Sequence, residues 1–116
     1  MRGEALDRTL AALADPTRRG VVDLLRRRPH RAGELSAALS MSAPAMSRHL
    51  RVLRETGLVE EATDAPEADD DARARVYRLR RAPFAQVRQW LDEVEGFWGD
   101  QLDAFKAHAE KTRGRK

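Results

Sequence analysis

One helix-forming segment, residues 42–57, carries side chains that could bind nucleic acid. Helical spacing places Pro44, Ser47, Arg48 and Arg51 on one side of this helix, opposite a stripe of apolar residues. An arginine can donate two parallel hydrogen bonds to guanine, and a serine can donate to a base or accept from it. The pattern predicts a helix that reads DNA in the major groove, and an ordinary surface helix with solvated arginines is the alternative.

The position of each side chain in this segment predicts a role for it. Small residues at its start would let the helix lie deep in the groove, and Arg48 is the candidate for contacting guanine. Arg51, Arg54 and His49 lie further along and are expected to contact phosphates, which fix the register of a protein on DNA. For His49, packing against the neighbouring helix is an alternative. The predicted DNA-contacting residues are Ser42, Ala43, Pro44, Ala45, Ser47, Arg48, His49, Arg51, Arg54, Arg73 and Arg75.

The flanking segments predict a winged helix-turn-helix, a mainly α fold with a small two-stranded β wing. Asp15 and Pro16 mark a helix start, because aspartate accepts hydrogen bonds from free amides and proline fits the first turn. Ser42 marks another start and Gly57 a helix end, whereas the helix after Arg31 starts with weak capping residues. The expected helices span residues 4–14, 16–28, 32–39, 43–56 and 83–110, and the expected strands span residues 58–63 and 75–80.

These elements form one domain over residues 1–116 in the order α-α-α-α-β-β-α, with about five helices. The length supports a single modest core. Residues 32–57 form the expected helix-turn-helix, and residues 58–80 form the expected wing. The tip of that wing, residues 64–72, is acidic, although arginines follow it. An acidic tip would repel phosphate, so either the base of the wing contacts the DNA backbone or the tip pairs with its own arginines.

The last expected helix, residues 83–110, carries more apolar surface than one helix on a small domain can cover. Part of it should cover the core, and the rest should pair with a second subunit together with the first helix, residues 4–14. Packing within one subunit is the alternative. The residues predicted at a dimer interface are Leu6, Leu10, Phe84, Val87, Leu91, Val94, Trp98, Leu102 and Phe105.

Composition narrows the classes of function. The chain has 22 Lys and Arg against 19 Asp and Glu, and only three of the 22 are lysines. Arginine suits phosphate and guanine contacts, although a genomic codon bias would raise the same count. There is no cysteine, which excludes disulfides and thiolate metal sites. No apolar run approaches the roughly 20 residues of a membrane span, so a cytoplasmic, soluble protein is expected. His30, His49 and His108 are scattered along the sequence and form no local acid-base constellation, so no enzyme is predicted.

Three stretches of the chain resemble the ArsR family of bacterial winged-helix repressors. They are residues 13–25, residues 47–59 and residues 75–79, and the resemblance covers roughly residues 5–110. It implies a homodimeric repressor with about five helices and a two-stranded wing.

Many members of that family sense metals, and the resemblance is greater to its metal-independent branch. The third helix of metal sensors carries cysteines, whereas this chain has Glu34-Leu-Ser-Ala-Ala-Leu39 there. Other members hold zinc between their terminal helices with Asp and His. Here His108 has only Asp103 and Glu110 nearby, and neither has the spacing that would place it beside His108 on one helical face. No metal and no cofactor is therefore predicted, with a metal site between two subunits as the alternative, and the sequence indicates no particular inducer.

Together, these observations predict a homodimeric, sequence-specific transcriptional repressor that binds double-stranded DNA at a palindromic operator. A winged-helix module that binds other proteins, without specific DNA binding, is one alternative. A nonspecific architectural DNA-binding protein is another.

Overall fold

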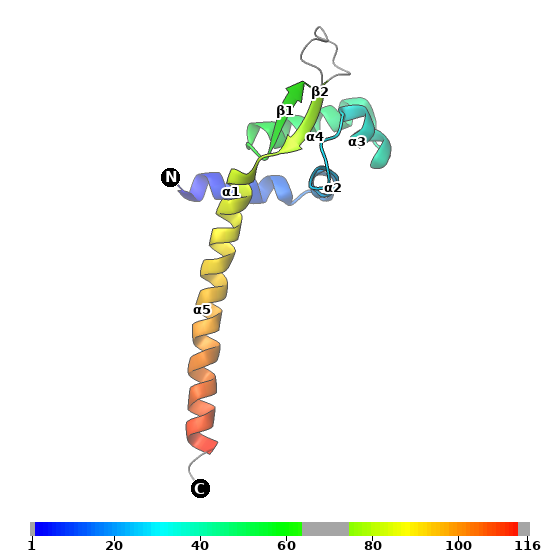
Figure 1. Cartoon of the computed structure of the whole chain (residues 1–116). Helices are drawn as coiled ribbons and strands as arrows, with labels where there is room; N and C mark the ends of the chain where they lie inside the picture. Colours follow the sequence, from blue (N-terminus) through cyan, green and yellow to red (C-terminus); the bar gives the residue numbers. More distant parts are fainter. Residues whose placement is uncertain (1, 64–74, 114–116) are drawn as a thin grey trace.

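A computed structural model describes residues 2–63 and 75–113 of the chain. Its elements are α1 (Arg2–Leu13), α2 (Pro16–Leu25), α3 (Ala32–Ala38), α4 (Ala43–Glu55), β1 (Val59–Thr63), β2 (Arg75–Leu79) and α5 (Arg81–Arg113). Figure 1 shows a small body from which the wing and the long helix α5 extend in opposite directions. This order confirms the predicted winged helix-turn-helix.

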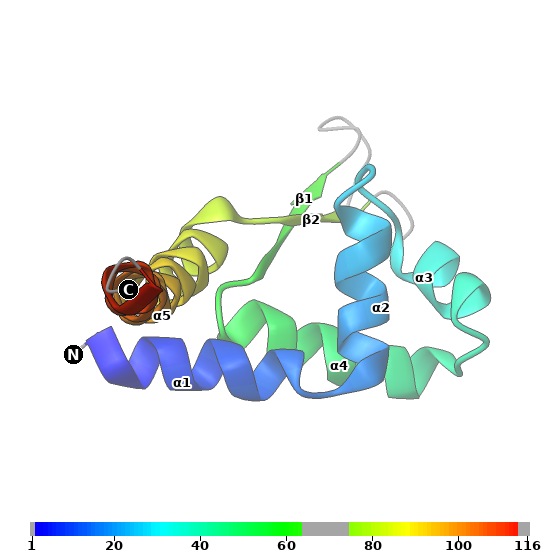
Figure 2. The same ribbon diagram turned by 90° about the horizontal axis from the view of Figure 1, so that it is seen from below.

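The core lies where α2, α3 and α4 meet the wing, and Figure 2 shows these elements around it. Leu35 from α3 and Met46 and Leu53 from α4 are fully buried there. Burying a side chain of this size contributes about 1.5–3 kcal/mol. The core therefore fixes which side of α4 faces inward. The buried apolar residues are Ala12, Val21, Leu25, Leu35, Met46, Leu50, Leu53, Leu58 and Val59.

Two helices end in a left-handed residue followed by a reversal of the chain. After α4, Gly57 has a φ of 78°, and the amide of Leu58 donates to the carbonyl of Leu53 at 3.0 Å. After α3, Ser40 has a φ of 52°, and the amide of Met41 donates to the carbonyl of Ser36 at 2.9 Å. These bonds satisfy carbonyls that each helix end would leave free.

The structure corrects two expectations about helix ends. The second helix ends at Leu25 and not at Arg28. The amide of Arg27 bonds to the carbonyl of Leu24 at 3.2 Å, three residues back, so the chain tightens into a turn before Pro29. The start of α3 is not weakly capped, since the Glu34 carboxylate accepts a hydrogen bond from the Arg31 amide at 3.0 Å. This bond holds the pKa of Glu34 below its usual value, and the side chain of Arg28 lowers it further.

The wing is an antiparallel pair in which Val59 lies opposite Leu79 and Glu61 lies opposite Tyr77. A bridge outside the strands extends it, because the amides and carbonyls of His30 and Tyr77 are bonded to each other at 3.1 and 2.7 Å. His30 is buried, and its Nδ1 lies 2.8 Å from the carbonyl oxygen of Arg28. The sequence suggested no partner for His30, and the structure shows that it has a structural one.

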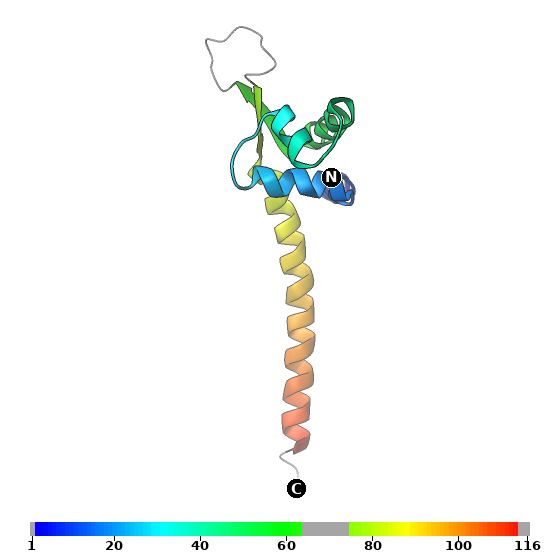
Figure 3. The ribbon, with the colours of Figure 1, turned by 90° about the vertical axis from the view of Figure 1, so that its right-hand side faces the viewer.

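Helix α5 is longer than predicted, at 33 residues, and Figure 3 shows most of it projecting beyond the body. Its first turns contact the rest of the fold, with Phe84 packed against the core and α1 crossing the helix. Phe97, Trp98, Leu102 and Phe105 lie further along and are 60–73% exposed. The distal part of α5 therefore presents apolar side chains to solvent within this subunit.

Candidate nucleic-acid interface

The side of α4 that was predicted to read DNA is open to solvent. Pro44, Ser47, Arg48 and Arg51 are all exposed, whereas Met46 on the opposite side is fully buried. Among the described residues, neither Arg48 nor Arg51 has an ion pair or a side-chain hydrogen bond. Their donors are therefore available to a ligand.

The first turn of α4 is held by its own sequence and by α3. The hydroxyl of Ser42 accepts a hydrogen bond from the amide of Ala45 at 3.3 Å, which caps the helix. Pro44 fits this turn because proline lacks the amide that a first turn leaves free. Ala43 is exposed and Ala45 is half-buried, so both predicted small contacts lie at the accessible end of the helix.

His49 faces the start of α2. Its side chain is only 21% exposed, and its Nδ1 lies 3.8 Å from a carboxylate oxygen of Asp15 and 3.5 Å from Nη1 of Arg18. Asp15 also accepts a hydrogen bond from the Arg18 amide at 3.0 Å, and this bond is the main reason that the pKa of Asp15 is lowered. In this arrangement His49 packs against the neighbouring helix, and its predicted phosphate contact stays a prediction.

Arg54 and Arg75 share a single carboxylate in the wing. Nη1 of Arg54 lies 3.2 Å from one oxygen of Glu61, and Nε of Arg75 lies 3.1 Å from the other. The Glu61 side chain is 19% exposed, while both arginine side chains are about half exposed. Glu61 therefore joins the last turn of α4 to the returning strand of the wing.

Tyr77 lies beside this cluster, opposite Glu61 in the sheet. Burial raises the pKa of the Tyr77 hydroxyl, and the negative charge of Glu61 raises it further. Arg54 and Arg75 act in the other direction. The hydroxyl therefore stays protonated at neutral pH, and the charges of the cluster are those of two guanidiniums and one carboxylate.

Glu60, the neighbour of Glu61 on β1, pairs with a second set of arginines. Its oxygens lie near Nε of Arg78 and, at 3.8 Å, near Nε of Arg80. Successive side chains of a strand point to opposite faces, so the clusters of Glu60 and Glu61 lie on different faces of the wing. Neither glutamate was a predicted site residue, because the partners of both lie on other elements of the fold.

The predicted site residues fall into three groups. The exposed side of α4 and its cap bring together Ser42, Ala43, Pro44, Ala45, Ser47, Arg48 and Arg51. His49 lies against the start of α2, and Arg54 and Arg75 meet at Glu61 at the other end of α4. Arg73 and the acidic tip lie outside the described residues. All eleven residues stay predictions as DNA contacts.

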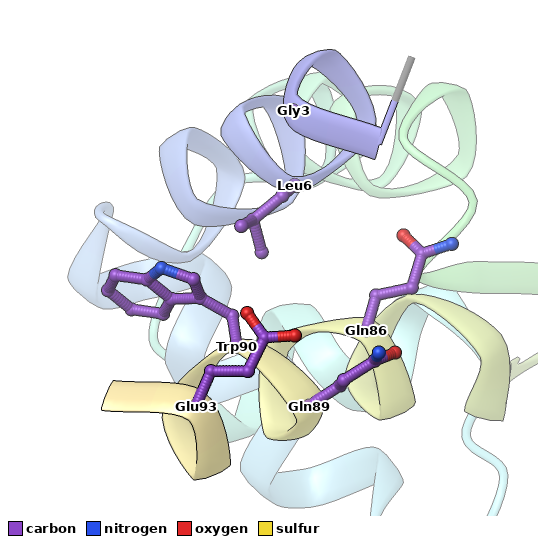
Figure 4. Close-up of a pocket in the computed structure, with 6 residues that line it drawn as sticks. All are labelled: Gly3, Leu6, Gln86, Gln89, Trp90 and Glu93. Carbon is purple, nitrogen blue, oxygen red and sulfur yellow. The ribbon is translucent and has the colours of Figure 1, made fainter. Parts of the chain in front are cut away.

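The predicted dimer residues belong to α1 and α5. Figure 4 shows Leu6 of α1 pointing toward α5 across a cavity of about 210 Å³, which Trp90, Gln86, Gln89 and Glu93 also line. Leu6 and Leu10 are half-buried, as are Val87 and Val94, whereas Leu91 is 47% exposed. Phe84 contributes to the core of its own subunit.

Two further findings concern residues 2–63 and 75–113 only. Within these ranges, no group of three His, Asp or Glu residues could hold a metal ion. No helix in the same ranges is both long enough and apolar enough to cross a membrane.

The chain is similar to known transcriptional regulators in sequence and in structure. The profile of the family described as "Bacterial regulatory protein, arsR family" matches residues 15–61. The HTH-type transcriptional regulator Rv2034 of Mycobacterium tuberculosis is 39% identical over 99 residues, which are 85% of this chain and 83% of that protein. A crystal structure of an ArsR family transcriptional regulator has a TM-score of 0.71 and 31% identity, and the match covers 84% of this chain and 93% of that one.

A more distant structure shares the fold. It is the solution structure of the homodimeric winged helix-turn-helix DNA-binding domain of a possible ArsR-family regulator from Mycobacterium bovis. Its TM-score is 0.60 at 22% identity, and the match covers 80% of each chain.

Proposed function

The chain belongs to the ArsR family of bacterial winged helix-turn-helix transcriptional regulators, and we propose that it is a homodimeric repressor of the metal-independent branch, which binds a palindromic operator. The family consists of regulators and not of enzymes. The single observation that carries the proposal is the exposed side of α4, where Arg48 and Arg51 have no partner among the described residues. Guanidinium groups left free on a capped, rigid helix are pre-positioned to contact DNA.

Roles within α4 follow from the distance of each side chain from its N-terminus. The first turns of a recognition helix reach base edges, so Ser47 and Arg48 read sequence and Ala43 to Ala45 allow close approach. Arg51 lies one turn further and contacts a phosphate. Ser42 keeps its hydroxyl on the Ala45 amide, so its contribution is to hold the helix start.

A second copy of the chain covers the apolar side of α5. Trp98 and Phe105 are 60% and 73% exposed in one subunit, which is a large unfavourable exposure for aromatic rings. A twofold pair is the commonest way to close such a surface. The related domain from Mycobacterium bovis is homodimeric, which supports the same assembly here. Two recognition helices then lie about one DNA turn, roughly 34 Å, apart.

Repression follows from occupation of the operator by the protein. A dimer that spans two half-sites of a promoter prevents transcription proteins from binding the same surface. The dependence of this complex on phosphate contacts predicts that its affinity falls steeply with salt.

The proposal is tested by substituting arginines on the exposed side of α4. Operator DNA would first be located by footprinting upstream of the protein's own coding region. We expect Arg48→Ala to cost about 1–3 kcal/mol and to relax base preference at one position of each half-site. Arg51→Ala is the matched control, because loss of a phosphate contact weakens all sequences alike.

Two results would contradict the proposal. One is unchanged operator selectivity in a titration of Arg48→Ala, which would remove its reading role. The other is a failure of operator binding. A protein-binding module would show no binding to promoter DNA at physiological salt, and a nonspecific architectural protein would show binding without a preferred sequence in footprinting. An affinity that does not respond to salt would count against direct contact with DNA.

A further inference from the structure

Glu61 lies between two arginines that the sequence predicts as DNA contacts. Its carboxylate is held between guanidiniums from two different elements, Arg54 at the end of α4 and Arg75 at the base of the wing. Two converging guanidiniums are a favoured binding arrangement for phosphate as well as for carboxylate. The arginine pair therefore has the chemistry of an anion site, and the anion present is part of the protein.

The two arginines are exposed, whereas the carboxylate between them is not. Arg54 and Arg75 are 51% and 49% exposed, so a phosphate can approach them from solvent. Each guanidinium has five N–H donors. The contacts to Glu61 occupy one nitrogen of each, and Arg54 is also hydrogen-bonded to the side chain of Tyr77, so donors of both arginines stay available to a phosphate. Glu61 is mostly buried, so its negative charge stays beside the pair and opposes an incoming phosphate.

We infer that Arg54 and Arg75 together form one phosphate-binding site and that Glu61 occupies this site in the free protein, which lowers the affinity for DNA of any sequence. This inference rests on the proposed DNA-binding function. Glu61 acts as an internal competitor of the DNA phosphate, and its charge neutralises one of the two positive charges of Arg54 and Arg75. Base reading by Arg48 takes place elsewhere on α4, so the ratio of operator to random affinity is not changed by Glu61.

The test measures binding to a DNA duplex of random sequence by fluorescence anisotropy over a range of salt concentrations. Glu61→Gln removes the charge and keeps the shape and the hydrogen-bond acceptor. We expect this variant to bind about three- to tenfold more tightly, with a slope of log affinity against log salt that is steeper by about 1. Glu61→Ala carries the same expectation and replaces Glu61→Gln if thermal melting shows that the latter is unfolded at the assay temperature.

Glu60→Gln is the matched control, since Glu60 is adjacent, has the same charge and pairs with its own two arginines. We expect Glu60→Gln to change the affinity less than Glu61→Gln. A double-mutant cycle with Arg54→Ala separates the specific effect from general electrostatics. The gain from Glu61→Gln should shrink in the Arg54→Ala background, because only one arginine of the site then remains.

Three outcomes would overturn the inference. These are weaker binding by Glu61→Gln, a gain no larger than that of Glu60→Gln, and a gain that persists undiminished in the Arg54→Ala background. The use of random DNA separates this test from that of the proposed function. Operator preference without a Glu61 effect overturns only the inference, and a Glu61 effect without operator preference overturns only the proposed function.

Discussion

Replacing Gly57 by alanine should lower the free energy of unfolding by about 1 kcal/mol. Gly57 has a φ of 78°, and an L-residue in the left-handed region costs about 1–2 kcal/mol. An added Cβ would lie 3.4 Å from Nη1 of Arg80 and 3.9 Å from Cγ of Pro83, so no clash adds to this cost. Alanine also restricts the unfolded chain more than glycine does, and this stabilises the folded variant by about 0.4–1 kcal/mol. The difference is a net loss that comes from the backbone alone.

The same geometry predicts the opposite sign at Ser40. This residue has a φ of 52° at the end of α3, so serine already carries the left-handed cost there. Ser40→Gly removes that cost. Glycine also gives the unfolded chain more conformational entropy, which offsets part of the benefit, so the free energy of unfolding should rise by about 0.5 kcal/mol. A glycine in the interior of a helix or strand would instead destabilise by roughly 0.5–1 kcal/mol.

Urea denaturation of the wild type and both variants measures these effects. The protein concentration must be the same in all titrations, because the stability of a dimer depends on it. The midpoints should move in opposite directions while the slope m is unchanged. A neutral Gly57→Ala together with a destabilising Ser40→Gly would refute the reasoning, since both results would mean that these residues are not left-handed.

Two further predictions concern a titrating group and the dimer. Because the pKa of Glu34 is lowered in the folded state, its charge stabilises the fold above its unfolded value of 4.5 and ceases to do so as pH falls through the folded value. Glu34→Gln should therefore melt below the wild type at pH 7, with a difference that shrinks as the pH falls below 4.5 and through the folded pKa; a constant difference in thermal melts would contradict this. Trp98→Ala removes roughly 100 Å² of exposed ring surface per subunit, so the dimer dissociation constant should rise at least about 100-fold. Sedimentation equilibrium measures this, with Gln101→Ala as the control on the same helix, and an unchanged constant would place Trp98 outside the interface.

The sequence was sufficient for the order of the elements because their ends depend on local rules. Asp15, Ser42 and Gly57 each act within a few residues, and the structure shows each at the predicted helix boundary. Glu34 follows the same kind of rule, since a glutamate three residues after the cap position is a known start signal. That signal was present at residues 31–34 and was missed because the capping residue itself is an arginine.

The pairings between distant residues could not be read from the sequence. Glu61 lies 14 residues from Arg75, and nothing in their spacing indicates that both meet Arg54. The bridge between His30 and Tyr77 likewise forms only when the loop after α2 reaches the wing. The composition indicated that many arginines are suited to contacts with DNA. The fold decides which of these arginines already pair with carboxylates of the protein.

The orientation of the recognition helix relative to the expected dimer surface is set within one subunit. Arg18 on α2 donates from Nε to the carbonyl oxygen of Ala12 on α1 at 2.7 Å, and its Nη1 lies 3.5 Å from His49 on α4. One guanidinium thus connects the helix that carries Leu6 and Leu10 to the helix that carries Arg48. The contact to Ala12 ties α2 closely to α1, and the longer contact to His49 brings the same guanidinium against α4. In the proposed dimer, which pairs through α1 and α5, the packing of these three helices within each subunit contributes to the spacing of the two α4 helices.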